Sequence, residues 1–426
     1  MSRKLIQSNS AITKLQATIL IVVVVCVIAG VLIVELRAPP KIEKPIKIGG
    51  LLDLTGALAA YGYSHEKTLS AAIRKINEEG GINGRLLELY VEDTETNPTV
   101  ATMKFRKLIE YWDVDFVLGP NHSGEAIACA PIAKELKTVF FGNIGATEFT
   151  TTQGNRYVFR ICSNVRQEVR AIAAWGFANL GKKWVTIVAD YSWGWSHEEE
   201  FKALAAKHGV EILATIRAPV GTKDFMPYIA KIPANAEAAL VAFFGTDLLC
   251  LLRDLRAVRP DLKIIIGNYG LTGIRTEDVP ETEGVYIVGP FPRRLESLDT
   301  PYTREFRKLI GMDEEGCEVG NPKIIYVHAY NWAVWEAVFA IKKAIEVSGW
   351  KSKADNPALI KTLEGMELKE SLAFPQGSKT IRAQDHQAFP TLFIEQVVNG
   401  KLRLIAKIPP ERTIYDPEVD YTREPL

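Results

Sequence analysis

The chain has 426 residues, well beyond the roughly 100–200 residues of a typical domain, so we expect two lobes. Lysine plus arginine and aspartate plus glutamate each number 51, and the formal net charge is therefore zero. This balance leaves no overall basic field that would hold nucleic acid. Apolar residues make up 47% of the chain, which excludes an intrinsically disordered protein.

An unbroken apolar run, ILIVVVVCVIAGVLIV, occupies residues 19–34 near the N-terminus. With its flanks it covers residues 15–36, enough to span a bilayer, which takes about 17–25 residues. We interpret it as an uncleaved signal anchor behind a short cytoplasmic N-terminus, residues 1–14. A cleaved signal peptide and a lipoprotein signal at Cys26 are alternatives, although no clear A-x-A site follows the run. The sequence therefore predicts an extracytoplasmic body at the cell membrane, joined to its anchor by the linker 37–45.

From residue 46 onward, apolar runs of strand length alternate with segments of helical periodicity. We expect a first set of strands at 46–52, 85–91, 116–118 and 139–141, separated by helices at 64–77, 99–112 and 124–136. A second set follows, with strands at 184–189, 239–243, 264–266 and 285–288 and helices at 198–207 and 248–258. A long helix at 324–346 and a hairpin at 392–408, turning at Asn399-Gly400, complete the pattern. The alternation predicts an α/β protein with two doubly wound units.

Catalysis and metal binding find no support in the motifs. There is no G-x-S-x-G, no P-loop and no G-x-G-x-x-G, so we expect neither an enzyme nor a cofactor. The spacing of the cysteines matches no zinc-binding motif, and Cys129 and Cys250 lie in apolar segments typical of buried thiols. Asp385-His386-Gln387 lacks an HxxxH or HExxH partner, and we interpret it as a hydrogen-bonded connector.

A set of short motifs appears in a characteristic order. They are GLLDLTGALAAYG at 50–62, GGING at 80–84, EDTETNP at 92–98, GPNHS at 119–123, GATEFT at 145–150 and DYSWG at 190–194. Over residues 46–410 the chain resembles the leucine/isoleucine/valine-binding family of type I periplasmic binding proteins, which serve ABC importers.

The resemblance implies two Rossmann-like lobes joined by three crossover strands, with a small-molecule ligand between them. The expected domain is residues 46–412, followed by a tail at 413–426. Lobe one would comprise 46–162 and 290–370, and lobe two 163–289 and 371–412. In open α/β sheets, ligands bind beyond the carboxyl ends of the strands.

Polar candidates for the ligand site follow two strands of the first unit. Ser123 opens a helix after the strand 116–118, where a hydroxyl and free backbone N–H groups make an anion site. A plain helix N-cap is the alternative for this serine. Gly145 and Thr147 follow the next strand, and the resemblance implies a ligand contact from this turn.

Aromatic candidates would line the apolar side of the site: Tyr61, Trp193, Phe244, Tyr269 and Tyr330. Each could instead belong to a core. Aromatic rings suit a closing site because they bury a large area and carry at most one polar group.

One departure from the family concerns charge. Its amino-acid binders hold the ligand ammonium with carboxylates from lobe two, but here the corresponding segments read ICSNV at 161–165, which contains Asn164, and Asn268-Tyr269-Gly270. A buried ammonium without a counter-charge is costly. We therefore expect a carboxylate or amide with an apolar or aromatic body, unless Asp190, Asp247 or Glu168 supplies the charge.

These features predict a solute-binding receptor that closes around its ligand and docks on ABC permease subunits. The alternative is a ligand-binding sensor ectodomain without a transport role.

Overall fold

The computed structural model describes residues 19–26, 44–267 and 270–426, and the chain divides into two compact units, 1–44 and 45–426. Residues 19–26 are helical and exposed. Within the described ranges, no helix is both long enough and apolar enough to span a bilayer. The anchor predicted at 15–36 lies mainly outside the described residues and stays a prediction.

The first sheet of the larger unit has five parallel strands in the order β2-β1-β3-β4-β5. Its central strands are buried on both faces, which explains why their sequences are continuous apolar runs. The strands are β1 (Ile46–Leu52), β2 (Leu87–Asp93), β3 (Phe116–Leu118), β4 (Val139–Phe141) and β5 (Val158–Phe159). The intervening helices are α2 (Ala59–Glu78), α3 (Pro98–Arg106), continued by a π turn at Lys107–Tyr111, and α4 (Ser123–Glu135).

The second sheet has seven strands in the order β16-β15-β10-β9-β8-β6-β7. Its strands are β6 (Lys183–Ala189), β7 (Glu211–Ala218), β8 (Ala238–Ala242), β9 (Lys263–Ile266), β10 (Tyr286–Gly289), β15 (Leu392–Val398) and β16 (Lys401–Ile408). The helices around it are α5 (Val165–Asn179), α6 (Ser192–Lys207), α7 (Met226–Ile229) and α8 (Gly245–Val258). Strands β6 to β10 are parallel, whereas β15 runs antiparallel to both of its neighbours.

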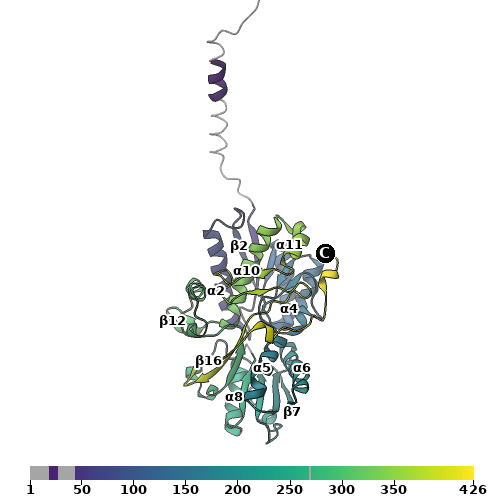
Figure 1. The fold of residues 1–426 in the computed structure, drawn as a ribbon, viewed down its shortest axis with the longest axis vertical. Coiled ribbons are helices and arrows are strands. Elements are labelled where there is room, and N and C mark those ends of the chain that lie inside the picture. The colour runs from purple at the N-terminus through teal and green to yellow at the C-terminus, as the bar shows by residue number, and fades with distance from the viewer. Residues whose placement is uncertain (1–18, 27–43, 268–269) are drawn as a thin grey trace, which may run out of the picture. The chain divides into compact units, whose positions relative to one another are not determined.

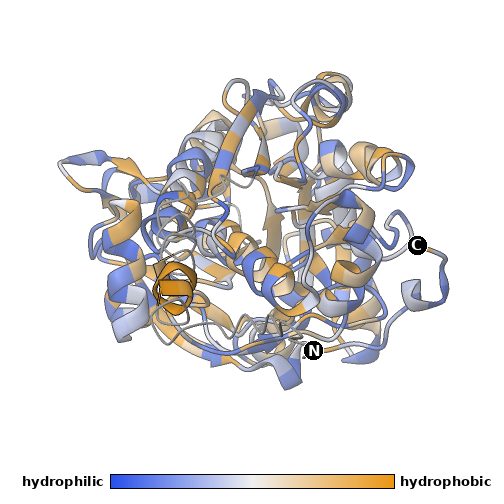
Figure 2. Cartoon of the chain, turned by 90° about the horizontal axis from the view of Figure 1, so that it is seen from above, coloured by the Kyte–Doolittle hydropathy of each residue, from blue (hydrophilic) through white to orange (hydrophobic). Residues whose placement is uncertain are grey.

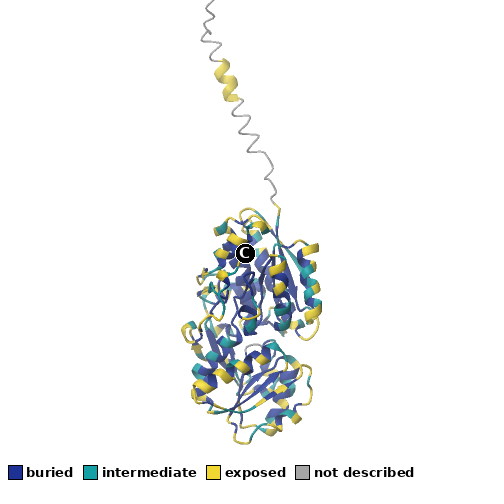
Figure 3. Cartoon of the chain, turned by 90° about the vertical axis from the view of Figure 1, so that its right-hand side faces the viewer, coloured by how far each residue is buried: buried dark blue, intermediate teal, exposed yellow. Residues whose placement is uncertain are grey.

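The predicted hairpin is confirmed. Its turn residues Asn399 and Gly400 have φ values of 53° and 73°, the left-handed conformation that an Asn-Gly turn adopts readily. We call the five-stranded sheet with the helices packed on it the first lobe, and the seven-stranded sheet with its helices the second lobe. Buried residues fill the interior of each lobe, and exposed residues follow the outer helices (Figure 3). Hydrophobic residues concentrate along the strands and the inward faces of the helices (Figure 2).

Between the two passages through the second sheet, the chain returns to the first lobe (Figure 1). Helix α10 packs against α2 and α11, and Trp332 and Trp335 of α10 are fully buried. This part of the chain comprises α9 (Pro301–Ile310), β11 (Cys317–Glu318), β12 (Asn321–Ile325), α10 (His328–Ser348), α11 (Asn356–Leu363), β13 (Glu367–Leu368) and β14 (Lys379–Thr380). The long helix thus begins four residues after its predicted start at 324, because residues 324 and 325 belong to strand β12, which pairs with β11.

The junction between the lobes contains the segment that leaves β5 and the segment that leads into β15. Arg160 pairs with Gln387 in an isolated parallel bridge. The backbone N–H of Arg160 donates to the His386 carbonyl at 3.1 Å, and the N–H of Ala388 donates to the Arg160 carbonyl at 2.9 Å. Backbone hydrogen bonds therefore tie two of the interlobe passages together.

The C-terminal tail after β16 also contacts both lobes. Tyr415 accepts a hydrogen bond from Asn164, which caps α5 of the second lobe, with an Nδ2–Oη distance of 2.5 Å. Tyr421 donates its hydroxyl proton to the carbonyl of Thr151, which follows the 3-10 turn η2 (Thr147–Thr150) of the first lobe, at 2.5 Å. The tail is therefore a further connection across the junction.

Candidate functional site

The predicted polar residues lie together at the carboxyl ends of β3 and β4. Ser123 is the first residue of α4, and Gly145 and Thr147 follow β4. Ser123 is not an N-cap, because His122 occupies that position without a side-chain capping bond. The Ser123 hydroxyl instead accepts a hydrogen bond from the Ala146 N–H at 3.3 Å. The α4 terminus and the turn after β4 thus form one polar cluster.

The second lobe approaches this cluster through α6. The Thr147 N–H donates to the Ser196 Oγ at 3.1 Å, and Ser196 Oγ donates to Thr147 Oγ1 at 3.0 Å. Next to this contact, the ring of His122 stacks on Tyr191 at a centroid distance of 5.0 Å and an interplanar angle of 10°. The lobes therefore touch at the carboxyl ends of their sheets.

Three aromatic rings of the second lobe gather at the same place. Tyr191 and Trp193 follow β6, and Phe244 follows β8. Their centroids lie 6.0–6.3 Å apart. Burial raises the pKa of Tyr191 well above its ordinary value, with smaller effects from Tyr61 and Asp53, so the phenol stays neutral near its first-lobe neighbours.

Sequence reasoning found Trp193 and Phe244 but missed Tyr191 and Ser196. The DYSWG motif holds the signal for Tyr191, since it places two aromatic residues at one strand end. Ser196 has no comparable signal, because its role depends on Thr147 in the other lobe. We call the cluster of Tyr61, Ser123, Gly145, Thr147, Trp193 and Phe244, with these two additions, the interlobe site.

The remaining predicted residues lie differently. Asn164 caps α5 by accepting from the Gln167 N–H at 2.9 Å, and its amide group donates to Tyr415 and, at 3.4 Å, to Gln387. Tyr330 is fully buried in α10, where its carbonyl accepts from Asn143 at 3.5 Å. Tyr269 and the preceding Asn268 lie outside the described residues. A ligand contact by these residues stays a prediction.

Of the three acids considered as ammonium partners, Asp190 and Asp247 bond to groups outside the site, whereas Glu168 is linked to Trp193 of the site through His197. Asp190 is exposed and accepts from Trp195 Nε1 at 2.7 Å, and Asp247 accepts from the Gly221 N–H and from Lys223. Glu168 is fully buried and accepts from Ser163 Oγ at 3.1 Å. Its other oxygen lies 3.4 Å from Nε2 of His197, whose ring packs edge-on against Trp193.

A buried pair of carboxyl groups, missed by sequence reasoning, lies behind the α4 terminus. Asp53 follows β1 and accepts from the Asn121 N–H at 2.8 Å. Burial raises the pKa of Asp53 to about 6, and burial together with the charge of Asp53 raises the pKa of Glu125 to about 10. At neutral pH the pair therefore shares one proton and carries one negative charge.

The Asp385-His386-Gln387 segment is a hydrogen-bonded connector, as predicted. Asp385 pairs with Arg382, and the His386 ring stacks on Phe159 at a centroid distance of 4.0 Å. Among the residues with described placement, no group of three or more His, Cys, Asp or Glu side chains could hold a metal ion.

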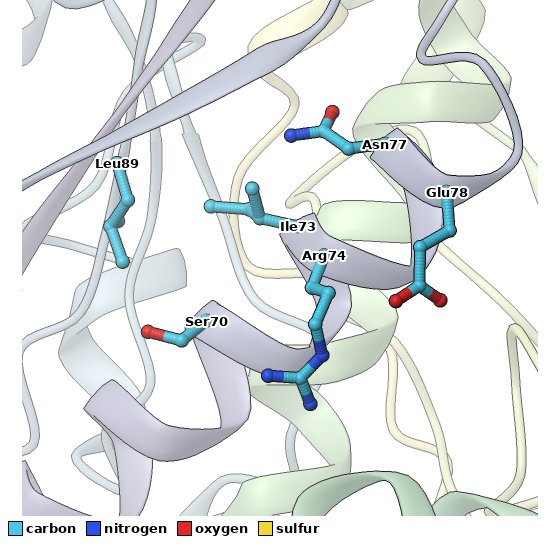
Figure 4. A pocket seen from close by; sticks show the side chains of 6 residues that line it. All are labelled: Ser70, Ile73, Arg74, Asn77, Glu78 and Leu89. Carbon is cyan, nitrogen blue, oxygen red and sulfur yellow. The ribbon is translucent and has the colours of Figure 1, made fainter.

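A separate hollow lies on the surface of the first lobe, between α2 and β2 (Figure 4). Its lining side chains are Ser70, Ile73, Arg74, Asn77, Glu78 and Leu89. None of the predicted site residues whose placement is described lines it.

Two α/β lobes that meet at the carboxyl ends of their parallel strands define the architecture of a two-lobed binding protein. The family described as periplasmic binding protein matches residues 45–401, and the chain belongs to this family. The family assignment and the type I fold predicted from the sequence are confirmed.

Curated relatives and solved structures cover most of the chain. The Leu/Ile/Val-binding protein homolog 4 of Brucella melitensis is 25% identical over 387 residues, which cover 85% of this chain and 86% of the relative. A solute-binding protein of an ABC transporter from R. palustris, solved with 4-hydroxybenzoate, has a TM-score of 0.73 at 21% identity and covers 86% of this chain and 97% of its own. LivJ of Streptococcus pneumoniae, solved with isoleucine, has a TM-score of 0.71 at 20% identity, with coverages of 85% and 99%.

Proposed function

We propose that the protein is the extracytoplasmic solute-binding receptor of an ABC importer of the branched-chain-amino-acid type. The observation that carries this proposal is the convergence of hydrogen-bond donors from the first lobe and aromatic rings from the second at the carboxyl ends of both sheets. Donors and rings that face each other across a hinged junction suit a small solute with one polar end and one apolar body.

The ligand in this proposal is a small amino acid, carboxylate or amide. Its anionic or carbonyl end binds at Ser123, Gly145 and Thr147, where backbone N–H groups and hydroxyls meet at a helix N-terminus. Its body packs against aromatic side chains: Tyr61, Trp193, Phe244, Tyr269 and Tyr330. Asn164 is the polar residue proposed at the passage between the lobes.

An aromatic or apolar carboxylate fits this arrangement better than a free amino acid. The second lobe presents aromatic rings at the site, and its buried acid Glu168 is already bonded to Ser163 and adjacent to His197. Solved relatives include both a 4-hydroxybenzoate complex and an isoleucine complex, so the family accommodates either class.

Binding would stabilise the closed arrangement, because the ligand contacts both lobes only when they meet. The closed form would then dock on the permease subunits, and residues 15–36 would keep the receptor at the membrane. The same lobes could instead serve a sensor ectodomain, and the Thr147–Ser196 contact suits either role.

A thermal-shift screen of the full chain tests the proposal. The panel holds leucine, isoleucine, valine, benzoate, 4-hydroxybenzoate and benzamide. A ligand at 100 times its Kd stabilises by about 2.7 kcal/mol, which shifts Tm by several degrees. A Tm shift with benzoates alone supports a carboxylate ligand without an ammonium group. A Tm shift with leucine shows that the site accommodates an ammonium. If none of the compounds shifts Tm, the proposed ligand class is rejected.

A further inference from the structure

Arg160, the residue after β5, is a fully buried cation whose bonding partners are all neutral. Its guanidinium donates to the carbonyls of Ile144 and Ala146 and to the side chains of Thr150 and Gln387. Among residues 44–267 and 270–426, no carboxylate oxygen lies within 4.0 Å of it in an ion pair. Glu148, in the same turn, interacts with this charge at longer range. Without a direct ion pair, burial of the guanidinium is costly.

The two carbonyls belong to the turn that carries Gly145 and Thr147. Nη1 of Arg160 lies 3.2 Å from the Ile144 oxygen and 2.6 Å from the Ala146 oxygen. In a planar trans peptide the C=O and N–H point in opposite directions. Two carbonyls held toward Arg160 therefore direct the N–H groups of Gly145 and Thr147 away from it. For Thr147 the result is visible, because its N–H donates to Ser196 of the second lobe.

The same contacts also change the strength of those donors. A hydrogen bond from a cation to a peptide oxygen polarises the whole peptide unit, and hydrogen bonds in series strengthen one another. The Gly145 and Thr147 N–H groups are thereby stronger donors than ordinary amides, and the Gly145 N–H can donate to an anion while the Thr147 N–H bonds Ser196. The positive charge itself adds a favourable field at the turn, weakly screened because Arg160 is fully buried.

The guanidinium is held rigidly in this orientation. Nε lies 2.6 Å from Gln387 Oε1, and Nη2 lies 2.6 Å from Thr150 Oγ1. The Gln387 amide nitrogen donates to the carbonyls of Cys162 and Ala388, which fixes its oxygen toward Arg160. The ring of Phe149 covers the guanidinium at 5.8 Å. Rotation of the Arg160 side chain away from the turn would break all of these hydrogen bonds.

We infer that Arg160 is a positioning residue that makes the interlobe site selective for ligands bearing a carboxylate over neutral carboxamides of the same shape. It acts through the peptides 144–145 and 146–147, without touching the ligand. The inference rests on the proposed function, since it assigns the charge class of the solute bound at that site.

The test compares matched probes, benzoate against benzamide and leucine against leucinamide, by calorimetry on the full chain. In Arg160→Gln, the affinity for the carboxylate should fall at least about tenfold and that for the carboxamide less than about threefold. Arg160→Lys keeps the charge and should retain most of the preference. The matched control is Arg307→Gln, because Arg307 is also buried and donates to the carbonyls of Pro292, Arg293 and Asp313, outside the interlobe site.

A second measurement needs no ligand. The amide proton resonances of Gly145 and Thr147 should move upfield in Arg160→Gln and stay in place in Arg307→Gln. If Arg160→Gln does not fold, Arg160→Lys is measured in its place. A single ammonium cannot replace all the hydrogen bonds of the planar guanidinium, so at least one of the two amide resonances must move.

The outcomes separate the two proposals. If the native chain binds none of the probes, the proposed ligand class fails, while the amide resonances still test Arg160. Equal losses for carboxylate and carboxamide, or unmoved amide resonances, would show that Arg160 is only structural and overturn the inference.

Discussion

Thr147 and Ser196 exchange two hydrogen bonds across the junction of the lobes, from the Thr147 N–H to Ser196 Oγ at 3.1 Å and from Ser196 Oγ to Thr147 Oγ1 at 3.0 Å. Both side chains are almost completely buried, so water cannot readily replace these bonds. The pair therefore favours the closed arrangement of the lobes.

Removal of this contact should weaken ligand binding. Ser196→Ala is expected to raise the Kd of the best ligand about threefold to tenfold, because each neutral hydrogen bond contributes roughly 0.5–1.5 kcal/mol. Calorimetry gives the Kd. Ser192→Ala is the matched control, since Ser192 lies in the first turn of the same helix and its hydroxyl has no hydrogen-bond partner among the described residues. Equal Kd values for the two variants would contradict a contribution from the pair.

Glu168 provides a test of the ligand's charge. If the ligand is a carboxylate without an ammonium, Glu168→Gln should change its Kd by less than about threefold, because the amide oxygen can still accept from Ser163. If an ammonium is bound near His197, the same variant should lose at least about tenfold in leucine affinity. Titration of both ligands into native and variant protein decides the matter. A large loss for benzoate would be inconsistent with the site as proposed.

The Asp53–Glu125 pair predicts a particular pH dependence of stability. Both folded-state pKa values, about 6 and about 10, exceed the ordinary values, so the folded protein holds protons that the unfolded chain releases. The contribution of these protons to the free energy of unfolding is complete below about pH 4 and is lost as the pH rises through 6 and toward 10.

Glu125→Gln removes one of these titrations. The Tm of the variant, relative to the native protein, should therefore rise between pH 5 and pH 9 in calorimetric scans. Glu199→Gln, at an exposed position of α6, is the control and should show a constant difference. If the Tm difference between Glu125→Gln and the native protein does not change with pH, the pair does not share a proton.

A buried ion pair in the first lobe should matter more for stability than the surface pairs do. Lys379 and Glu336 are both fully buried at their side chains, with an Nζ–Oε2 distance of 2.7 Å, and burial raises the pKa of Glu336 to about 7. Lys379→Met should lower the free energy of unfolding by about 3–5 kcal/mol, since it leaves a carboxylate buried alone. Denaturant titration measures this loss.

The double variant Lys379→Met/Glu336→Leu supplies the comparison. It removes both charges and should recover most of the loss. If the double variant is as unstable as Lys379→Met, the loss reflects packing against Trp332 instead of an unpaired charge.

The central strands of both sheets were predictable because they are short apolar runs buried on two faces, and the hairpin because Asn399-Gly400 suits its turn. Several elements were missed, namely β5, the edge strand β7 and the helices α5, α9 and α11. The residues of β7 are largely exposed or half-buried, so no apolar run marks them. Helix α5 carries an early capping signal at Asn164, whose significance is clear only from its bond to the Gln167 N–H.

The candidate site was predictable only one lobe at a time. Ser123 and Trp193 are visible in the sequence because each follows a strand and opens a helix. Ser196 and Arg160 are not, because their roles arise from partners on other elements, the Thr147 N–H and the carbonyls of Ile144 and Ala146. Such contacts are created by the packing of segments that carry no local signal for one another.

The C-terminal tail changes the mechanics of the hinge. Tyr415 is anchored at the start of α5 and Tyr421 at Thr151, while Glu424 forms an ion pair with Lys134 of α4 at 2.8 Å. Any opening that lengthens the path between Asn164 and Thr151 must stretch or detach this strap. The tail therefore adds to the free-energy cost of any movement that separates Asn164 from Thr151.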